Sequence, residues 1–176
     1  MTIANLRRLA TGIATAALLF SSAHADTALP APEGPALLTI TGTVGLTNGT
    51  SGDQPAALLD RGQLEGLPQH TVKTSTDWTD GVVTFKGPLA RDVLDLIQAD
   101  GTKVAAIAAN DYRIDIPVDD FRRYDVLMAM TMNGKRMSLR DKGPIWIVYP
   151  RDDHPELMDP AYNGRWIWQL VRLELE

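Results

Sequence analysis

The sequence contains no cysteine among its 176 residues. The chain can therefore form no disulfide, and it can offer no thiolate to a metal ion. Histidine is also scarce, and His70 and His154 are too far apart for the usual spacing of a zinc site. Neither a Gly-x-Ser-x-Gly nor a His-Glu-x-x-His motif occurs. These absences exclude nucleophile-elbow hydrolases and zinc metalloproteases.

Positive charge and long apolar runs are also in short supply. Lysine and arginine number 17 against 22 aspartates and glutamates, which gives a formal net charge of −5. An acidic chain lacks the basic surface that nucleic acid requires, and anionic lipid would repel it. The longest apolar run, residues 9–20, is too short to span a bilayer comfortably. We therefore expect neither nucleic-acid binding nor direct insertion into a membrane.

The first 25 residues have the pattern of a cleavable signal peptide. Arg7 and Arg8 precede the apolar run, and Ala23-His24-Ala25 is a small-x-small cleavage site. We expect cleavage after Ala25 and a soluble product in the periplasm. Cleavage removes two of the 17 basic residues and no acidic one, so the product is more acidic than the full chain.

Residues 26–35 are rich in proline and predict an extended tether, and residues 36–176 have the length of one domain. Short apolar segments dominate this domain, and Asn133-Gly134 is a hairpin signal. Residues 152–163 predict a long polar loop. The patterns predict strands at 36–44, 70–76, 82–85, 103–109, 112–116, 126–132, 145–149 and 166–174, and helices at 55–64, capped by Asp53, and 88–99. Such a sequence favours an α+β fold with a largely β core.

Five recognisable segments follow one another in a fixed order. They are Phe85-Lys86-Gly87-Pro88-Leu89, Asp111-Tyr112, Asp125-Val126-Leu127-Met128-Ala129 with Met132-Asn133-Gly134, Gly143-Pro144 through Tyr149-Pro150, and Trp168. Together they resemble the molybdopterin-binding domain of the sulfite oxidase family over residues 70–176. The resemblance implies a mixed β core with a few flanking helices, and a pocket for a pterin.

The departures from that family concern the metal and the phosphate of its cofactor. The resemblance places the metal-binding cysteine at the end of strand 70–76, where this chain has Thr74, Ser75 and Thr76. A hydroxyl is a poor donor for a soft, thiophilic metal. By the same resemblance, Trp146 and Ile167 replace an arginine and a lysine that bind phosphate, and Lys142 is the cation that remains. We therefore expect no metal and no phosphorylated pterin.

This chain combines the segments of a pterin-binding fold with the lack of a metal ligand. In this combination it is similar to a cysteine-less periplasmic branch of the family. That resemblance implies binding of a reduced, non-phosphorylated pterin without catalysis. It also implies a partner, the periplasmic domain of an inner-membrane diguanylate cyclase or phosphodiesterase in cyclic di-GMP signalling. Two alternatives stay open. One is a molybdopterin-dependent oxidoreductase, and the other is an interaction domain that has lost its pocket.

A pterin requires aromatic faces for stacking and a carboxylate that accepts hydrogen bonds from its donor edge. The candidates at strand ends are Thr76, Asp77, Trp78, Asp111, Tyr112, Lys142 and Trp168. Each has a structural alternative. Trp78 could pack in the core, Trp168 could pack against helix 88–99, and Lys142 could be an ordinary solvated charge. The two aspartates could be turn residues. No residue is expected to be catalytic or to bind a metal.

Overall fold

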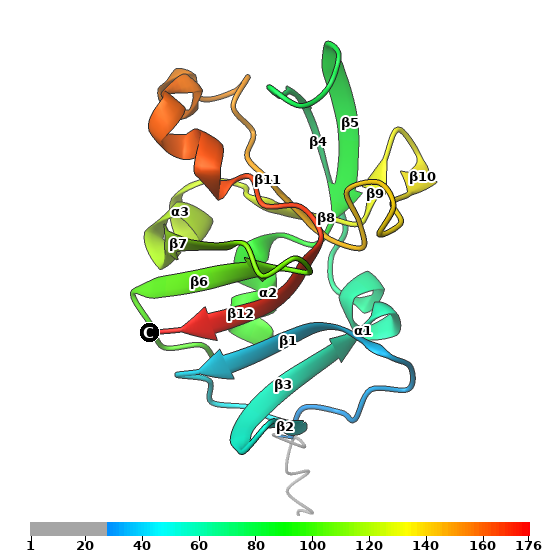
Figure 1. Ribbon diagram of the computed structural model, residues 1–176, viewed down its shortest axis with the longest axis vertical. Coiled ribbons are helices and arrows are strands. Elements are labelled where there is room, and N and C mark those ends of the chain that lie inside the picture. Colours follow the sequence, from blue (N-terminus) through cyan, green and yellow to red (C-terminus); the bar gives the residue numbers. More distant parts are fainter. Residues whose placement is uncertain (1–27) are drawn as a thin grey trace, which may run out of the picture.

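The computed structural model describes residues 28–176, so the predicted signal peptide lies outside the described residues. A six-stranded mixed sheet forms one half of the molecule (Figure 1). Its strands are β1 (Ala36–Gly42), β2 (Gly49–Ser51), β3 (Gln54–Asp60), β6 (Lys103–Ala108), β7 (Arg113–Pro117) and β12 (Leu170–Leu175), in the order β2-β3-β1-β12-β6-β7. β1 and β12 run parallel, and the other neighbours are antiparallel.

Two smaller antiparallel sheets form the other half. One has the order β10-β9-β5-β4 and contains β4 (His70–Ser75), β5 (Val82–Gly87), β9 (Thr131–Met132) and β10 (Lys135–Arg136). The other pairs β8 (Leu127–Ala129) with β11 (Trp146–Val148). The predicted hairpin at Asn133-Gly134 is confirmed, since both residues have positive φ, as a two-residue hairpin turn requires, and Met132 pairs with Lys135.

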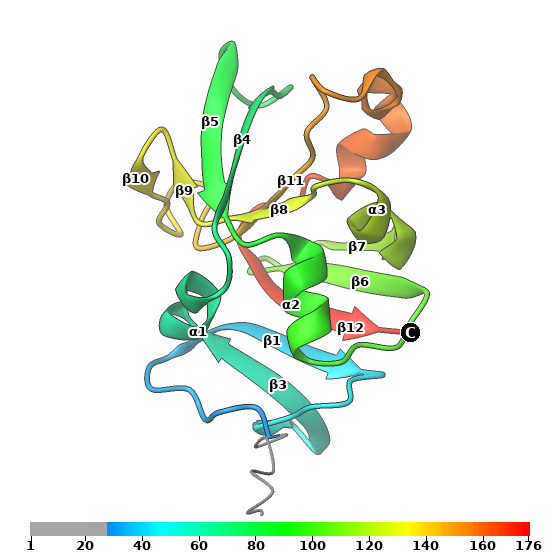
Figure 2. The ribbon, with the colours of Figure 1, turned by 180° about the vertical axis from the view of Figure 1, so that it is seen from behind.

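In the described part of the chain, three short α-helices and two 3₁₀ helices complete the fold. They are α1 (Arg61–Gly66), α2 (Ala90–Leu96), α3 (Val118–Arg123), η1 (Pro155–Met158) and η2 (Pro160–Arg165). α2 covers one face of the large sheet (Figure 2) and buries Val93, Leu94 and the following Ile97 there. Within residues 28–176 no helix has the length and apolarity to cross a bilayer. The expected α+β class, a mixed β core with few helices, is confirmed.

The predicted helix at 55–64, with Asp53 as its cap, is wrong. Residues 54–60 form strand β3, which pairs with β1 on one side and with β2 on the other. The helix begins only at Arg61, and Asp60 caps it by accepting a hydrogen bond from Gln63 N while Gln63 Oε1 accepts from Asp60 N. Pairing on both edges has overridden the local helical preference.

Three other expectations need correction. Helix α3 was not predicted, although Asp119 and Asp120 in its first turn and Arg122 and Arg123 in its last turn match the helix dipole. The predicted polar loop 152–163 contains η1 and most of η2. The last strand begins at Leu170 rather than at residue 166, and residues 166–168 instead line a cavity.

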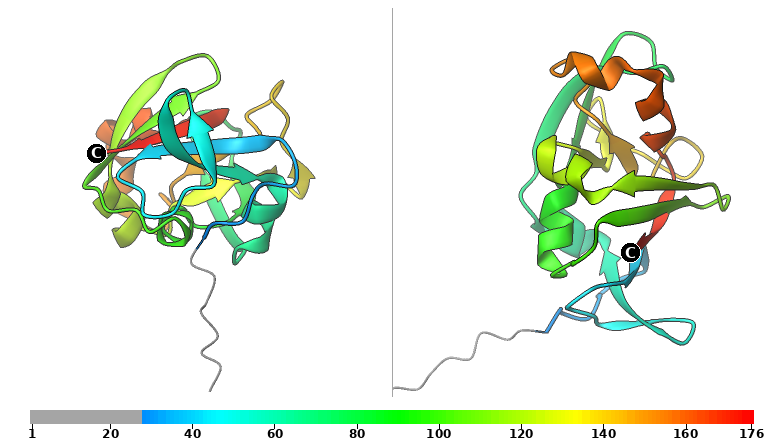
Figure 3. Two further views of the ribbon diagram at one scale, coloured as in Figure 1. Left: turned by 90° about the horizontal axis from the view of Figure 1, so that it is seen from below. Right: turned by 90° about the vertical axis from the view of Figure 1, so that its left-hand side faces the viewer.

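Residues 28–35 have no regular secondary structure, but they are bound to the domain. Pro30 O accepts hydrogen bonds from Asn48 Nδ2 at 2.7 Å and from Gln63 Nε2 at 2.8 Å. The backbone N–H groups of Glu33 and Gly34 donate to Asp60 Oδ2. In side view the β2–β3 hairpin lies at one end of the molecule, whereas the η1–η2 segment lies beside β4 and β5 at the other (Figure 3). The cavity is at this second end.

Candidate ligand-binding site

A cavity of about 300 Å³ opens between the β6–β7 turn, the end of η2 and the turn after β4. Its walls are mainly aromatic and aliphatic, and a few amide and hydroxyl groups interrupt them. The lining residues are Trp78, Ala108, Asn110, Tyr112, Asn163, Gly164, Trp166, Ile167 and Trp168. A mostly apolar cavity with a few polar groups is the usual composition of a small-molecule site, and this volume lies at the lower end of the usual range.

All four tryptophans of the chain meet around this cavity. Trp78 packs against Trp166 with ring centroids 5.9 Å apart and against Trp168 at 5.7 Å. Trp146 is fully buried behind them and contacts the same two rings at 6.4 and 6.2 Å. Trp146 therefore belongs to the core, whereas the other three rings form the wall of the cavity.

The turn that carries Trp78 is fixed by polar contacts. Thr76 is buried, and its Oγ1 accepts a hydrogen bond from Trp78 N at 3.0 Å. Asp77 accepts from Arg151 Nη1 at 2.7 Å and from Asn163 Nδ2 at 2.8 Å. Because Asn163 lies in η2, Asp77 joins the turn after β4 to the opposite wall of the cavity.

A second contact nearby joins the end of β4 to the segment after β11. Ser75 donates from its backbone N–H to Asp152 Oδ2 at 2.7 Å and from Oγ to Asp152 Oδ1 at 2.6 Å. Burial alone would raise the pKa of the Asp152 carboxyl, but the two hydrogen bonds from Ser75 and the charge of Arg151 outweigh it, so the pKa lies below its ordinary value of 3.8. The segment after β11 is thus attached to β4 by an ionised carboxylate.

The end of η2 is held by a third carboxylate. Asp120, in α3, is buried, and its Oδ2 accepts from Arg165 Nη1 at 2.5 Å and from the Tyr149 hydroxyl at 2.8 Å. The Arg165 guanidinium also lies over the Tyr162 ring at 4.5 Å. Burial, together with the Asp120 charge, raises the pKa of Tyr149 well above its ordinary value of 10.0. This network fixes the position of η2 immediately before Trp166.

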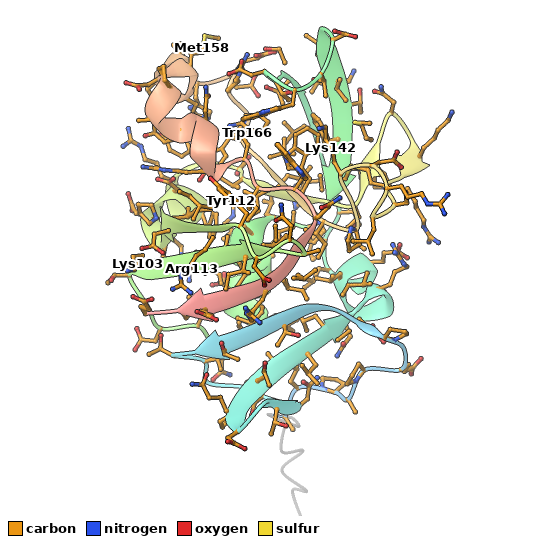
Figure 4. All side chains as sticks on the ribbon, viewed as in Figure 1. Lys103, Tyr112, Arg113, Lys142, Met158 and Trp166 are labelled. Carbon is orange, nitrogen blue, oxygen red and sulfur yellow. The ribbon has the colours of Figure 1, made fainter. Side chains whose placement is uncertain are left out.

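The structure separates the predicted site residues into two groups. Trp78, Tyr112 and Trp168 line the cavity, and the Tyr112 hydroxyl lies 3.5 Å from Gly164 O. The alternative position of Trp168, packed against helix 88–99, is not the one observed, because Trp168 contacts tryptophan rings and lines the cavity. Figure 4 shows Tyr112 and Trp166 close to η2, with Lys142 farther toward β9 and β10.

The other predicted residues lie outside the lining. Asp111 is exposed in the β6–β7 turn with φ of 64°, as its turn alternative requires. Thr76 and Asp77 position the turn before Trp78. Lys142 Nζ lies 4.5 Å above the Trp168 ring and 5.2 Å from the centre of the Trp146 ring, a cation–π arrangement rather than a free solvated charge.

Sequence reasoning missed two polar lining residues, since Asn110 and Asn163 were not singled out. Trp166 belonged to a candidate segment, residues 165–168, but was expected in a strand. Asn110 precedes Asp111 in a tight turn, and Asn163 lies at the end of the polar segment before Trp166. Asparagine is common in turns and loops for local reasons, so neither position carries a clear signal in the sequence, and only the fold brings the two together at the cavity.

The described residues do not fit a molybdenum cofactor. At the end of β4 the Thr74 hydroxyl accepts from Asp152 N and the Ser75 hydroxyl donates to Asp152, so both hydroxyls already have protein partners. Residues 28–176 contain no group of three or more His, Cys, Asp or Glu side chains arranged to hold a metal ion.

The cations near the cavity are also engaged. Arg151 pairs with Asp77, Arg165 pairs with Asp120, and Lys142 lies over two tryptophan rings. A phosphate would have to displace a carboxylate or an aromatic contact to bind any of the three. The site therefore suits a small uncharged heterocycle better than a phosphorylated one.

A mixed β domain of the sulfite-oxidase type, with an aromatic cavity, is the class that the fold and the site define. The sequence profile of the family "Oxidoreductase molybdopterin binding domain" matches residues 61–152, and the chain belongs to this family. Its fold is similar to the crystal structure of the sulfane dehydrogenase SoxCD from Paracoccus pantotrophus, with a TM-score of 0.57 and 16% identity. That match covers 78% of this chain and 37% of the other. No curated protein sequence matches.

Proposed function

We propose that the protein binds a reduced, non-phosphorylated pterin in the aromatic cavity and performs no catalysis itself. The observation that carries the proposal is the wall of Trp78, Trp166 and Trp168, which lies beside the strand end where relatives are expected to bind their metal. The family match supports a pterin as the ligand. The lack of a thiolate and the pairing of the nearby cations favour the pterin ring without metal and phosphate.

The chemistry of the cavity suits a flat bicyclic ligand. Aromatic faces stabilise a heteroaromatic ring by stacking, which contributes about 1–3 kcal/mol per base in nucleic-acid complexes. Trp166 Nε1 is buried and has no hydrogen-bond partner among the described residues. A buried donor of this kind is costly to leave unpaired, so an acceptor on a ligand would stabilise the complex.

Isolation of the protein from its own compartment tests the proposal. The purified protein is expected to release a fluorescent oxidised pterin on denaturation and to contain no stoichiometric molybdenum by elemental analysis. The apoprotein should then bind a reduced pterin, such as tetrahydrobiopterin, in isothermal titration calorimetry under anaerobic conditions. Absence of heat with every reduced or oxidised pterin tried would remove the proposal.

The second candidate function is a molybdopterin-dependent oxidoreductase, and the family match is the observation that favours it. It requires a tricyclic pyranopterin phosphate and a metal in the isolated protein. The same elemental analysis distinguishes the two functions, because stoichiometric molybdenum would support the oxidoreductase and contradict the pterin-binding protein.

The proposal includes a signalling partner. We propose that the protein is exported to the periplasm and acts there on the periplasmic domain of an inner-membrane enzyme that makes or degrades cyclic di-GMP. The support is the resemblance to the cysteine-less branch, together with the signal-peptide pattern of residues 1–25. A tagged copy should retain such an enzyme from solubilised membranes, to different extents with and without tetrahydrobiopterin. Retention that is absent in both conditions would overturn this part alone.

A further inference from the structure

Two asparagine side chains line the cavity from two different segments. Asn110 lies in the β6–β7 turn and Asn163 lies in η2. An amide group has a donor end and an acceptor end, and which end is free depends on what its neighbours already bind. Both asparagines have a neighbour that can act in one direction only.

Asn163 is oriented by Asp77. The Asp77 carboxylate can only accept a hydrogen bond, so the Asn163 atom that lies 2.8 Å from it must be Nδ2. The carbonyl Oδ1 of Asn163 is then the end that remains without a partner among residues 28–176. Asp77 also binds Arg151, which fixes the carboxylate itself. This side of the cavity therefore presents an acceptor.

Asn110 is oriented the opposite way. The backbone N–H of Tyr112 can only donate, so the Asn110 atom that lies 3.2 Å from it must be Oδ1. The amide Nδ2 of Asn110 is the end that has no other partner in the described part of the chain. The turn is tight, since Asp111 N also donates to Ala108 O at 3.0 Å, so the side chain is held locally. This side of the cavity therefore presents a donor.

We infer that Asn110 and Asn163 together select the 2-amino-4-oxo edge of a pterin, an inference that rests on the proposed function. The 4-oxo group accepts from Asn110 Nδ2, and the neighbouring ring N–H and 2-amino groups donate to Asn163 Oδ1. A 2,4-diaminopteridine presents the reverse pattern at two positions, because it has an amino donor at position 4 and a bare acceptor at ring nitrogen 3. Mismatched polar pairs at the cavity wall are costly, so it binds more weakly.

The experiment compares two probes that differ only at this edge, 6-hydroxymethylpterin and 2,4-diamino-6-hydroxymethylpteridine, by titrating the tryptophan fluorescence of the apoprotein at neutral pH. The wild-type protein is expected to bind the 4-oxo probe about tenfold more tightly, as the loss of one hydrogen bond implies. Equal affinities, or a preference for the diamino probe, would overturn this inference and leave the proposed function intact. No binding of either probe would overturn this inference, and no binding of tetrahydrobiopterin as well would overturn both.

The variant Asn110→Asp tests the residue directly. A carboxylate still accepts from Tyr112 N–H, but its free end becomes an acceptor, so the preference is expected to reverse toward the diamino probe. The matched control is Asn133→Asp, which makes the same charge change in the β9–β10 hairpin, where Asn133 Oδ1 accepts from Thr84 N at 3.1 Å. If the ratio of the affinities for the two probes is the same in Asn110→Asp as in the wild type, Asn110 is not the selecting residue. This holds whether or not the wild type discriminates between the probes.

Discussion

Replacement of Trp78 by alanine is expected to lower the affinity for tetrahydrobiopterin by about 10- to 100-fold, which corresponds to the usual range for loss of one stacking contact. Trp78 lines the cavity and contacts both Trp166 and Trp168, so its removal deletes one aromatic face and loosens the other two. Isothermal titration calorimetry on the apoprotein measures the change.

Two further variants show whether the effect comes from stacking. Trp78→Phe keeps an aromatic face and should retain most of the affinity. Val82→Ala, a change at an exposed position on the same β4–β5 hairpin, should have no effect. An alanine variant that is folded by circular dichroism and binds with unchanged affinity would place the ligand elsewhere.

Replacement of Asp120 by alanine is expected to lower the free energy of unfolding by about 3 kcal/mol. The change leaves the Arg165 guanidinium and the buried Tyr149 hydroxyl without their shared acceptor. Arg165 keeps partial access to water, which limits the loss. Urea denaturation followed by tryptophan fluorescence measures it, because Trp166 follows Arg165 directly.

The control is Tyr149→Phe, which removes one hydrogen bond and should lower the free energy of unfolding by about 1 kcal/mol at neutral pH. The pKa of Tyr149 is raised in the folded state, so its stabilising contribution is complete below pH 10.0 and is lost as the pH rises further. The phenylalanine variant should therefore lose less stability than the wild type above pH 10. Part of the alkaline loss should persist, since burial raises the pKa of Tyr124 to about 12. If the free energy of unfolding depends on pH identically in the wild type and in Tyr149→Phe, Tyr149 does not contribute to the alkaline loss of stability.

Local signals predicted much of the sheet framework. Asn133-Gly134 predicts its hairpin because few residues tolerate the two positive φ angles, and alternating or β-branched segments such as 70–75 predict strands. β3 was predicted as a helix because the two strands that pair with it are not visible within its own sequence. Long-range pairing decides such segments, and no local pattern contains it.

The candidate site could be predicted only in part. Trp78 stood out because a tryptophan in a polar setting is unusual, and it does line the cavity. Asn163 could not be recognised, because its role depends on a hydrogen bond to Asp77 that only the folded chain forms. Lys142 was a candidate, but its contact with the Trp168 ring could not be predicted, because only the folded chain forms it.

The cavity wall combines Trp78, which follows β4, with Tyr112 from the β6–β7 turn and Trp168 from the segment before β12. An unfolded chain offers no equivalent surface, so a molecule that enters the cavity binds the native state alone. Mass action then adds about 2.7 kcal/mol to stability at a free concentration one hundred times the dissociation constant. When the ligand is scarce, the protein would be less stable and proteases would degrade it faster. The amount of protein would therefore follow the concentration of the ligand.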